Sequence, residues 1–241
     1  MNIYAINDIA ELIRGNSYVG RGIVIGKSED GTKACTAYFI MGRSANSRNR
    51  VFRMENGVLS TEPYDASKVE DPSLIIYRAI RSLGNRLIVT NGDHTDTIYD
   101  GLCAGKTFSE ALQSRTFEPD APNCTPRISA MITTDNGDAV FDMSILKSID
   151  GTTCARQFFS YESVNGIGYL IHTYDGDGNP LPSYSGEPKQ VVIPDSIDDF
   201  AQPLWEALDE DNKISLYVRY TDLTSGGIEE RLFNKNSEAS L

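Results

Sequence analysis

Residues 90–97, with the sequence TNGDHTDT, concentrate side chains that can bind or transform a polar ligand. They directly follow the apolar run 87–89, and His94 is one of only 2 histidines among 241 residues. A strand that ends in such a stretch delivers hydrogen-bonding side chains and a tight turn to one place, as a binding pocket requires. The alternative interpretation is an ordinary β-turn, because Asn-Gly is the strongest short hairpin signal and Asp and Thr are common turn residues.

Arginines form a second concentration, with four of them between Arg43 and Arg53. Arg48 and Arg50 share a polar segment with Asn46. Guanidinium groups match the oxygens of phosphate and carboxylate bidentately, so this segment is a candidate anion site. The alternative is a solvated loop whose arginines form surface ion pairs.

Tyr77 and Glu118 add groups that can move protons. The spacing of apolar residues predicts a helix over residues 73–83, and a tyrosine on such a helix is usually half-buried with a satisfied hydroxyl. Glu118 lies in a loop with three prolines, residues 117–126, where Glu-Pro-Asp is ordinary composition. Neither residue alone supports a functional claim.

The sequence gives little support for metal or cofactor chemistry. His94 and His172 could ligate a metal, but no other His, Cys or carboxylate lies at a recognised ligand spacing from them. The chain has no GxGxxG or Walker-type phosphate loop, and its start, Met1-Asn2, disfavours an N-terminal nucleophile. We therefore predict neither a metal nor a cofactor.

The composition excludes some partners. The chain has 34 acidic and 22 basic residues and a net charge of -12. Such a surface repels phosphodiester backbones, so we expect no nucleic-acid partner, although a local arginine cluster can still hold a small anion.

The cysteines and the apolar runs indicate a cytoplasmic protein. Cys35, Cys103, Cys124 and Cys154 include no CxxC pair, so we expect reduced, mostly buried thiols. No apolar run is long enough to span a membrane, and residues 1–8 lack the features of a signal peptide, so we expect no membrane partner.

The elements that must position these residues are mostly strands. We predict strands over residues 20–26, 33–41, 51–54, 58–60, 86–90, 127–133, 139–146, 155–161, 168–173, 190–193, 214–222 and 229–233. We predict helices over residues 8–14, 73–83, 108–114 and 197–208, the last broken or kinked by Pro203. Residues 175–188 are rich in Gly and Pro and should be irregular.

This pattern favours the α+β class and one domain. Many antiparallel strands with few helices are typical of a single α+β domain. We expect this domain to comprise residues 1–241, with an N-terminal extension over residues 1–17 and a frayed tail over residues 234–241.

Four segments, in chain order, resemble those of archaeal-type IMP cyclohydrolases. They are GRS at residues 42–44 followed by Arg48, YRAIR at 77–81, NGDHTDT at 91–97 and TPRI at 125–128. The resemblance is good over residues 18–132 and loose in the later half. NGDHTDT is the most specific segment, TPRI is moderately specific, and the arginine segment is specific only in context.

The resemblance implies a fold and a reaction. The fold would be a four-layer αββα sandwich like that of the N-terminal-nucleophile hydrolases, without their nucleophile. The reaction would close 5-formamidoimidazole-4-carboxamide ribonucleotide to IMP and water, the last step of purine synthesis, so the partner would be a small purine nucleotide. For the C-terminal third we leave two roles open, covering the pocket or forming the interface of a homo-oligomer.

The residues similar to the family's catalytic groups are Arg48, Tyr77 and Glu118. We expect Arg48 to stabilise the oxyanion that develops on the formyl group, Tyr77 to relay a proton, and Glu118 to orient or deprotonate the carboxamide. The resemblance also implies a set of substrate-binding residues, namely Arg21, Arg43, Asn46, Asn91, Gly92, Asp93, His94, Thr95, Thr97, Asn123 and Arg127. Of these, Arg21, Arg43 and Arg127 are the candidates for binding the phosphate.

Two other functions stay open at this point. A related amide-processing enzyme of the same fold would need a nucleophile exposed by self-cleavage, and a non-catalytic nucleotide-binding protein would keep only the pocket. The presence of Arg48, Tyr77 and Glu118 favours the cyclohydrolase, because a protein that only binds has no need of acid–base groups.

Overall fold

The computed structural model describes residues 6–69 and 76–236. Its strands form two sheets in which neighbouring strands are antiparallel. The first sheet has the order β11 (Lys189–Val192), β10 (Ile167–His172), β1 (Arg21–Lys27), β2 (Lys33–Met41), β12 (Lys213–Asp222) and β13 (Ile228–Asn234). The second has the order β3 (Arg50–Glu55), β4 (Val58–Pro63), β5 (Tyr77–Leu83), β6 (Arg86–Thr90), β7 (Arg127–Asp135), β8 (Asp138–Ser148) and β9 (Cys154–Glu162).

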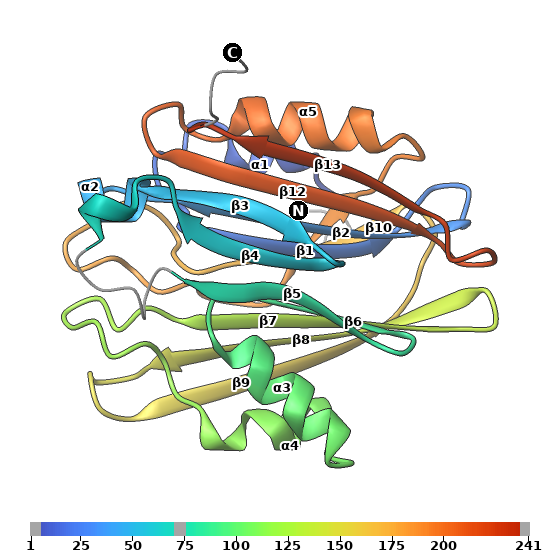
Figure 1. Ribbon diagram of the computed structural model, residues 1–241, viewed down its shortest axis with the longest axis horizontal. Helices are drawn as coiled ribbons and strands as arrows, with labels where there is room; N and C mark the ends of the chain where they lie inside the picture. Colours follow the sequence, from blue (N-terminus) through green and yellow to red (C-terminus); the bar gives the residue numbers. More distant parts are fainter. Residues whose placement is uncertain (1–5, 70–75, 237–241) are drawn as a thin grey trace.

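The helices lie on the outer faces of the two sheets (Figure 1). The first sheet is covered by α1 (Ile9–Ile13) and α5 (Ile197–Ala207), and the second by α3 (His94–Cys103) and α4 (Phe108–Ala111). The short elements α2 (Ala45–Arg48), η1 (Ala66–Lys68) and η3 (Leu112–Ser114) lie in connections. The α+β class predicted from the sequence is confirmed.

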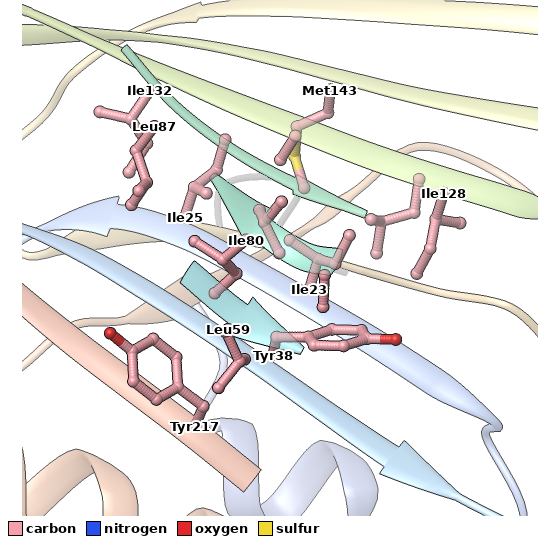
Figure 2. Close-up of a cluster of buried hydrophobic side chains, with 14 of the residues drawn as sticks. Ile23, Ile25, Tyr38, Leu59, Ile80, Leu87, Ile128, Ile132, Met143 and Tyr217 are labelled. Carbon is pink, nitrogen blue, oxygen red and sulfur yellow. The ribbon is translucent and has the colours of Figure 1, made fainter. Parts of the chain in front are cut away.

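The apolar cores lie between these layers. The largest is between the two sheets, where side chains such as Ile23, Leu59 and Ile128 interdigitate (Figure 2). A second core joins the first sheet to α1 and α5, and a third joins the second sheet to α3 and α4. A sheet buried on both faces needs strands that are apolar almost throughout, and β2 is buried along its whole length after Lys33.

Most predicted elements are present. The hairpin β3–β4 turns through Asn56 and Gly57, which both have positive φ angles of 50° and 75°, as a type I′ turn requires. Asp8 caps α1 and Thr107 caps α4 through their side-chain oxygens. Residues 175–188 contain no helix or named strand, as predicted.

The helix predicted over residues 73–83 is wrong where the structure describes it. Residues 77–83 form β5, while residues 73–75 lie outside the described residues. Tyr77 and Ala79 point into the core between the sheets, and Arg78 between them is exposed. Pairing with β4 and β6 therefore overrode a helix-like spacing of apolar residues.

The helix α3 was not predicted, because the residues before it looked like a turn. Asn91-Gly92-Asp93 does form a bend after β6, but a helix begins at His94. Its buried face carries His94, Ile98 and Leu102 at helical spacing, which was the signal that could have revealed it. Gly101 lets α4 approach closely, since an added Cβ atom would lie 2.5 Å from the Cβ of Ala111.

Two smaller expectations also need correction. Pro203 was predicted to break or kink its helix, and the break is wrong, because α5 runs through Pro203 to Ala207. The tail predicted from residue 234 begins too early, because Asn234 ends β13 and its side chain accepts a hydrogen bond from the Phe52 backbone nitrogen at 2.8 Å. Residues 237–241 lie outside the described residues.

The structure also bears on the predictions made for the cysteines and for membrane-spanning segments. The four cysteines are free thiols, of which Cys35 and Cys124 are buried, Cys154 is half-buried and Cys103 is exposed. Among the helices that the structure describes, none combines the length and the apolar character that a membrane crossing would need.

Candidate functional site

A polar pocket of about 280 Å³ lies where β1 begins, beside the connection from β2 to β3. Its volume is close to the lower end of the range for small-molecule sites. Its lining residues come from four separate segments of the chain and are mostly polar or charged: Tyr18, Arg21, Arg43, Ser44, Asn46, Ser47, Arg50, Glu118, Asp120, Asn123, Thr125, Tyr174 and Leu181.

Arg21 and Glu118 form the buried charged pair of this polar pocket. Arg21 Nη2 lies 3.8 Å from Glu118 Oε2, and the exposed fractions of the two side chains are 12% and 7%. Burial raises the pKa of the Glu118 carboxyl, and the Arg21 and Arg127 guanidiniums oppose this shift. Burial also opposes the charge on Arg21, but Glu118 and nearby tyrosines hold the Arg21 pKa above its usual range.

Arg21 still has an unused donor. Its Nε is buried and has no hydrogen-bond partner within the described residues. The same is true of Asn46 Oδ1 across the polar pocket. Buried polar atoms without partners are costly and uncommon in native proteins, so these two groups are suited to contact a polar ligand.

The arginine segment delivers Arg50 and not Arg48 to the polar pocket. Ser44 and Ser47 form a capping box that starts the single turn of α2. Arg48 is exposed, and its Nε and Nη2 donate to the Gly42 carbonyl at 3.0 Å and to Asn212 Oδ1 at 2.9 Å. The predicted catalytic Arg48 is therefore not brought together with Tyr77 and Glu118.

Arg50 takes the inner position. It is only 2% exposed, its Nε donates to the Ser47 carbonyl at 2.7 Å, and its Nη2 donates to the Met41 carbonyl at 3.3 Å. Burial and, next, the nearby charge of Arg21 lower the Arg50 pKa. A guanidinium remains protonated in proteins even so, and Arg50 is thus a buried cation without a carboxylate of its own among the described residues.

Tyr77 lies behind the lining of the polar pocket. Its hydroxyl and that of Tyr38 are 2.8 Å apart, and both side chains are buried. The Tyr77 phenol is close enough to Arg21 and Arg50 to interact electrostatically with both guanidiniums. The phenol, the two guanidiniums and Glu118 thus form one connected group.

The stretch 90–97 fixes the backbone beside this group. Asn91 donates to the Pro126 carbonyl at 2.9 Å and accepts from the Ile128 nitrogen at 2.9 Å. The hydroxyls of Thr90 and Thr95 are 2.6 Å apart and buried. The Asn91 contacts join the segment before α3 to the start of β7, and the Thr90–Thr95 contact joins the end of β6 to α3.

Gly92 is the part of this stretch nearest to the acid. A Cβ atom added to Gly92 would lie 2.8 Å from Arg127 Nη1 and 3.3 Å from Glu118 Oε1. Asp93 is exposed, and its Oδ1 accepts from Arg127 Nη1 at 2.7 Å and from Arg115. The stretch therefore reaches the polar pocket through Arg127 and Glu118.

His94 is a neutral support for Arg127. Its Nε2 lies 3.1 Å from the Ile128 carbonyl, which can only accept, so Nε2 carries the proton and Nδ1 accepts from Arg127 Nη1 at 3.3 Å. Burial, followed by the charge of Arg127, lowers the His94 pKa to about 3. The ring is consequently uncharged at neutral pH.

The remaining predicted residues are spread around the rim. Arg43 donates to the Gly178 carbonyl at 2.8 Å, pairs with Asp177, and lies with its Cζ 5.1 Å from the centre of the Tyr18 ring. Asn123 lines the polar pocket. Thr97 is half-buried on α3, outside the lining.

Sequence reasoning missed several lining residues. Tyr18 and Tyr174 stack with ring centres 5.9 Å apart, and Tyr174 donates to the Thr125 hydroxyl, which donates to Asp120. Thr125 stands in the TPRI segment and Asp120 in the same loop as Glu118, which was the only signal for them. Tyr174 comes from the loosely similar half, where no motif marks it.

The chain is similar in sequence to known proteins. The family model described as IMP cyclohydrolase-like protein matches residues 18–226. A protein named IMP cyclohydrolase from Methanococcus aeolicus is 33% identical over 119 residues, which cover 48% of this chain and 58% of that protein. One of the same name from Methanopyrus kandleri is 38% identical over 116 residues, which cover 46% and 57%.

A longer match extends to Methanocaldococcus jannaschii. Its protein named IMP cyclohydrolase is 27% identical over 188 residues, which cover 73% of this chain and 83% of that protein. For the Methanococcus aeolicus and Methanopyrus kandleri relatives, the chain spans less than two thirds of their own length.

Proposed function

The chain belongs to the IMP cyclohydrolase-like protein family, and from this premise we propose that it closes the ring of 5-formamidoimidazole-4-carboxamide ribonucleotide to give IMP and water. The observation that carries the proposal is the buried group of Arg21, Arg50 and Glu118, which line one cavity together with Asn46, while Arg21 and Asn46 each hold a buried atom without a partner among the described residues. Such a group suits an anionic, hydrogen-bonding substrate that undergoes proton transfer.

The reaction sets three demands on this site. The carboxamide nitrogen attacks the formyl carbon, so an N–C bond forms and a hydroxyl replaces the formyl oxygen. The carboxamide and the formamide nitrogen each give up one hydrogen, and the former formyl oxygen leaves as water while a C=N bond forms. Because an amide nitrogen is a poor nucleophile, the site must hold a near-attack geometry, remove a proton and stabilise an oxyanion.

Arg50 replaces Arg48 in our assignment of the oxyanion donor. It is buried beside Arg21 and lines the polar pocket, whereas Arg48 bonds to Gly42 and Asn212 at the surface. A fixed donor in a desolvated site stabilises developing charge far more than a solvated one. Tyr77, adjacent to both buried guanidiniums, relays the proton.

Glu118 is the acid–base group of the proposal. Burial, which raises its carboxyl pKa, brings that pKa closer to neutrality, where a group can both take and give a proton. Glu118 takes the proton from the carboxamide nitrogen and gives it to the oxyanion, which becomes a hydroxyl. Tyr77 relays the hydrogen of the formamide nitrogen to this hydroxyl, which leaves as water. Arg21, 3.8 Å away, holds the carboxylate in position.

The phosphate belongs at the rim in this arrangement. Arg43 is the most exposed lining arginine, and it lies next to Asn46, whose Oδ1 accepts from the substrate. Arg127, the third candidate from the sequence, is held by Asp93 and His94 and acts on Glu118. Asn91 and Thr95 hold the chain around the start of α3, and Gly92 leaves room for the Glu118 carboxylate.

We also propose a fold type for the chain. Two sheets with helices on their outer faces are the arrangement expected of the four-layer sandwich of N-terminal-nucleophile hydrolases. We assign the whole chain to one such domain without the self-cleaving nucleophile. A full-length intact mass would support this assignment, and loss of an N-terminal fragment would contradict it.

The activity is tested by incubating the purified full chain with the formamido ribonucleotide in the presence of a chelator. Formation of IMP well above the uncatalysed rate supports the proposal, and no acceleration rejects it. Tight IMP binding without turnover would instead identify a nucleotide-binding protein. A matched comparison of Glu118→Gln with Glu55→Gln, which is exposed and lies at the end of β3, ties the rate to the polar pocket.

A further inference from the structure

A second cavity in the described part of the chain is larger than the polar pocket. It is a cleft of about 640 Å³ on the outer face of the second sheet, beside the connection from α3 to α4. We name it the outer cleft. Its lining residues are Arg86, Leu102, Gly105, Lys106, Thr107, Phe108, Ser109, Met131, Thr133, Asp142, Phe158, Phe159 and Ser160. Leu102, Phe108 and Met131 of this lining belong to the apolar core beneath it, and Phe158 packs against that core.

The floor of the outer cleft is apolar. Phe108 and Phe158 meet edge to face, with ring centres 6.5 Å apart and planes at 84°. Met131 lies on the outer face of β7 beside them. A floor of rings and a thioether suits a flat aromatic ligand, which buries area there and stacks favourably.

Asp142 places a carboxylate in this apolar setting. It lies on β8 opposite Ser160 of β9, and it is half-buried. Burial raises the Asp142 pKa. No cation pairs with this carboxylate among the described residues. Its oxygens can therefore accept hydrogen bonds from a ligand.

Arg86 and Lys106 bring cations to the same cleft. Neither forms an ion pair within residues 6–69 and 76–236. On the central strand β7, Thr133 lies opposite Arg86 of β6, and Met131 lies opposite Asp142 of β8. Arg86 and Asp142 are therefore separated by two strand spacings across the sheet and by two residues along the strands. Strand spacing and rise put their Cα atoms about 12 Å apart, a separation that one mononucleotide can bridge.

We propose that the outer cleft binds a guanine mononucleotide. The guanine edge presents two adjacent donors, N1–H and the 2-amino group, which match the two oxygens of the Asp142 carboxylate. The ring lies on Phe158 and Met131, and the phosphate reaches Arg86 and Lys106. This site is separate from the polar pocket and does not rest on the proposed reaction.

The carboxylate also sets the order of preference among bases. Hypoxanthine offers N1–H but has no 2-amino group beside it, so one carboxylate oxygen is left without a donor from the base. Adenine sets an N1 acceptor next to its amino group, so one carboxylate oxygen faces a lone pair. Guanine should therefore bind most tightly, hypoxanthine less and adenine least.

The test is isothermal titration of the full chain with GMP, IMP, AMP and guanosine. GMP is expected to bind most tightly, and Asp142→Asn is expected to weaken GMP binding about 10- to 100-fold, the loss of charge-assisted hydrogen bonds. The matched control is Asp135→Asn, which removes an exposed charge from the neighbouring strand β7 and should leave GMP affinity within about twofold.

The phosphate contact is tested with Arg86→Gln. This variant should weaken GMP binding but leave guanosine binding unchanged, because guanosine has no phosphate. The proposal is overturned if GMP does not bind at millimolar concentration, or if Asp142→Asn leaves its affinity unchanged. It is also overturned if GMP binding is lost in Arg21→Gln and kept in Asp142→Asn, since that places GMP in the polar pocket.

Discussion

Arg48 and Arg50 offer a matched pair of substitutions, because their guanidiniums make the same number of hydrogen bonds to the protein. Arg50 donates to two backbone carbonyls, and Arg48 donates to one carbonyl and one side-chain amide. Replacement of either by Lys keeps the charge and removes these two bonds. At about 0.5–1.5 kcal/mol per bond, each variant should lose about 1–3 kcal/mol of stability, with Arg48→Lys at the low end because Arg48 is exposed.

The two variants should differ in rate far more than in stability. Arg50→Lys also removes an oxyanion donor, which lowers kcat about 100- to 1,000-fold, or about 3–4 kcal/mol. Arg48→Lys should stay within about threefold of the parent, because its guanidinium lies outside the polar pocket.

The assay measures IMP formation at saturating substrate, with melting temperature recorded for both variants. A loss of 1–3 kcal/mol lowers the melting temperature of a chain this size by about 2–12 °C, so assays run well below that range compare folded enzymes. A large rate loss in Arg48→Lys with near-normal turnover in Arg50→Lys would refute the assignment.

Three further predictions concern residues around Glu118. Tyr38→Phe removes the hydroxyl 2.8 Å from that of Tyr77 and should lower kcat about tenfold, and an unchanged kcat would show that this contact has no part in turnover. The folded pKa of His94, about 3, lies below the unfolded value of about 6.5, so the unfolded state binds more protons between them. Stability should therefore fall by up to about 1.4 kcal/mol per pH unit below pH 6, and urea unfolding of His94→Gln should give a shallower dependence. Gly92→Ala puts a methyl 3.3 Å from Glu118 Oε1 and should reduce kcat, whereas Gly176→Ala, with no atom closer than 3.7 Å, should match the parent in the same assay.

The strands could be predicted because their causes are local. The run 33–41 is almost wholly apolar, and Asn-Gly turns such as 56–57 fix the hairpins by their positive φ angles. The strand β5 could not be predicted, because its apolar spacing fits a helix and only its pairing with β4 and β6 decides otherwise. Non-local pairing leaves no mark within a short window of sequence.

The site was predictable in part. Arg21, Glu118 and Arg127 were chosen from the sequence and do converge, since all three interact electrostatically around the carboxylate. The choice between Arg48 and Arg50 depends on where the single turn of α2 ends, a matter of two residues. Tyr38 and Tyr174 reach the site through sheet register and the irregular segment after β10, which spacing along the chain does not encode.

The central claim is that ring closure takes place between Arg50, Tyr77 and Glu118. A crystal structure of the full chain with IMP tests it most directly. We predict that the purine C2 atom, which was the formyl carbon, lies within contact of Arg50 and Glu118, in front of Tyr77, and that the phosphate lies at Arg43. IMP bound elsewhere, or bound with its phosphate against Glu118, would contradict the claim.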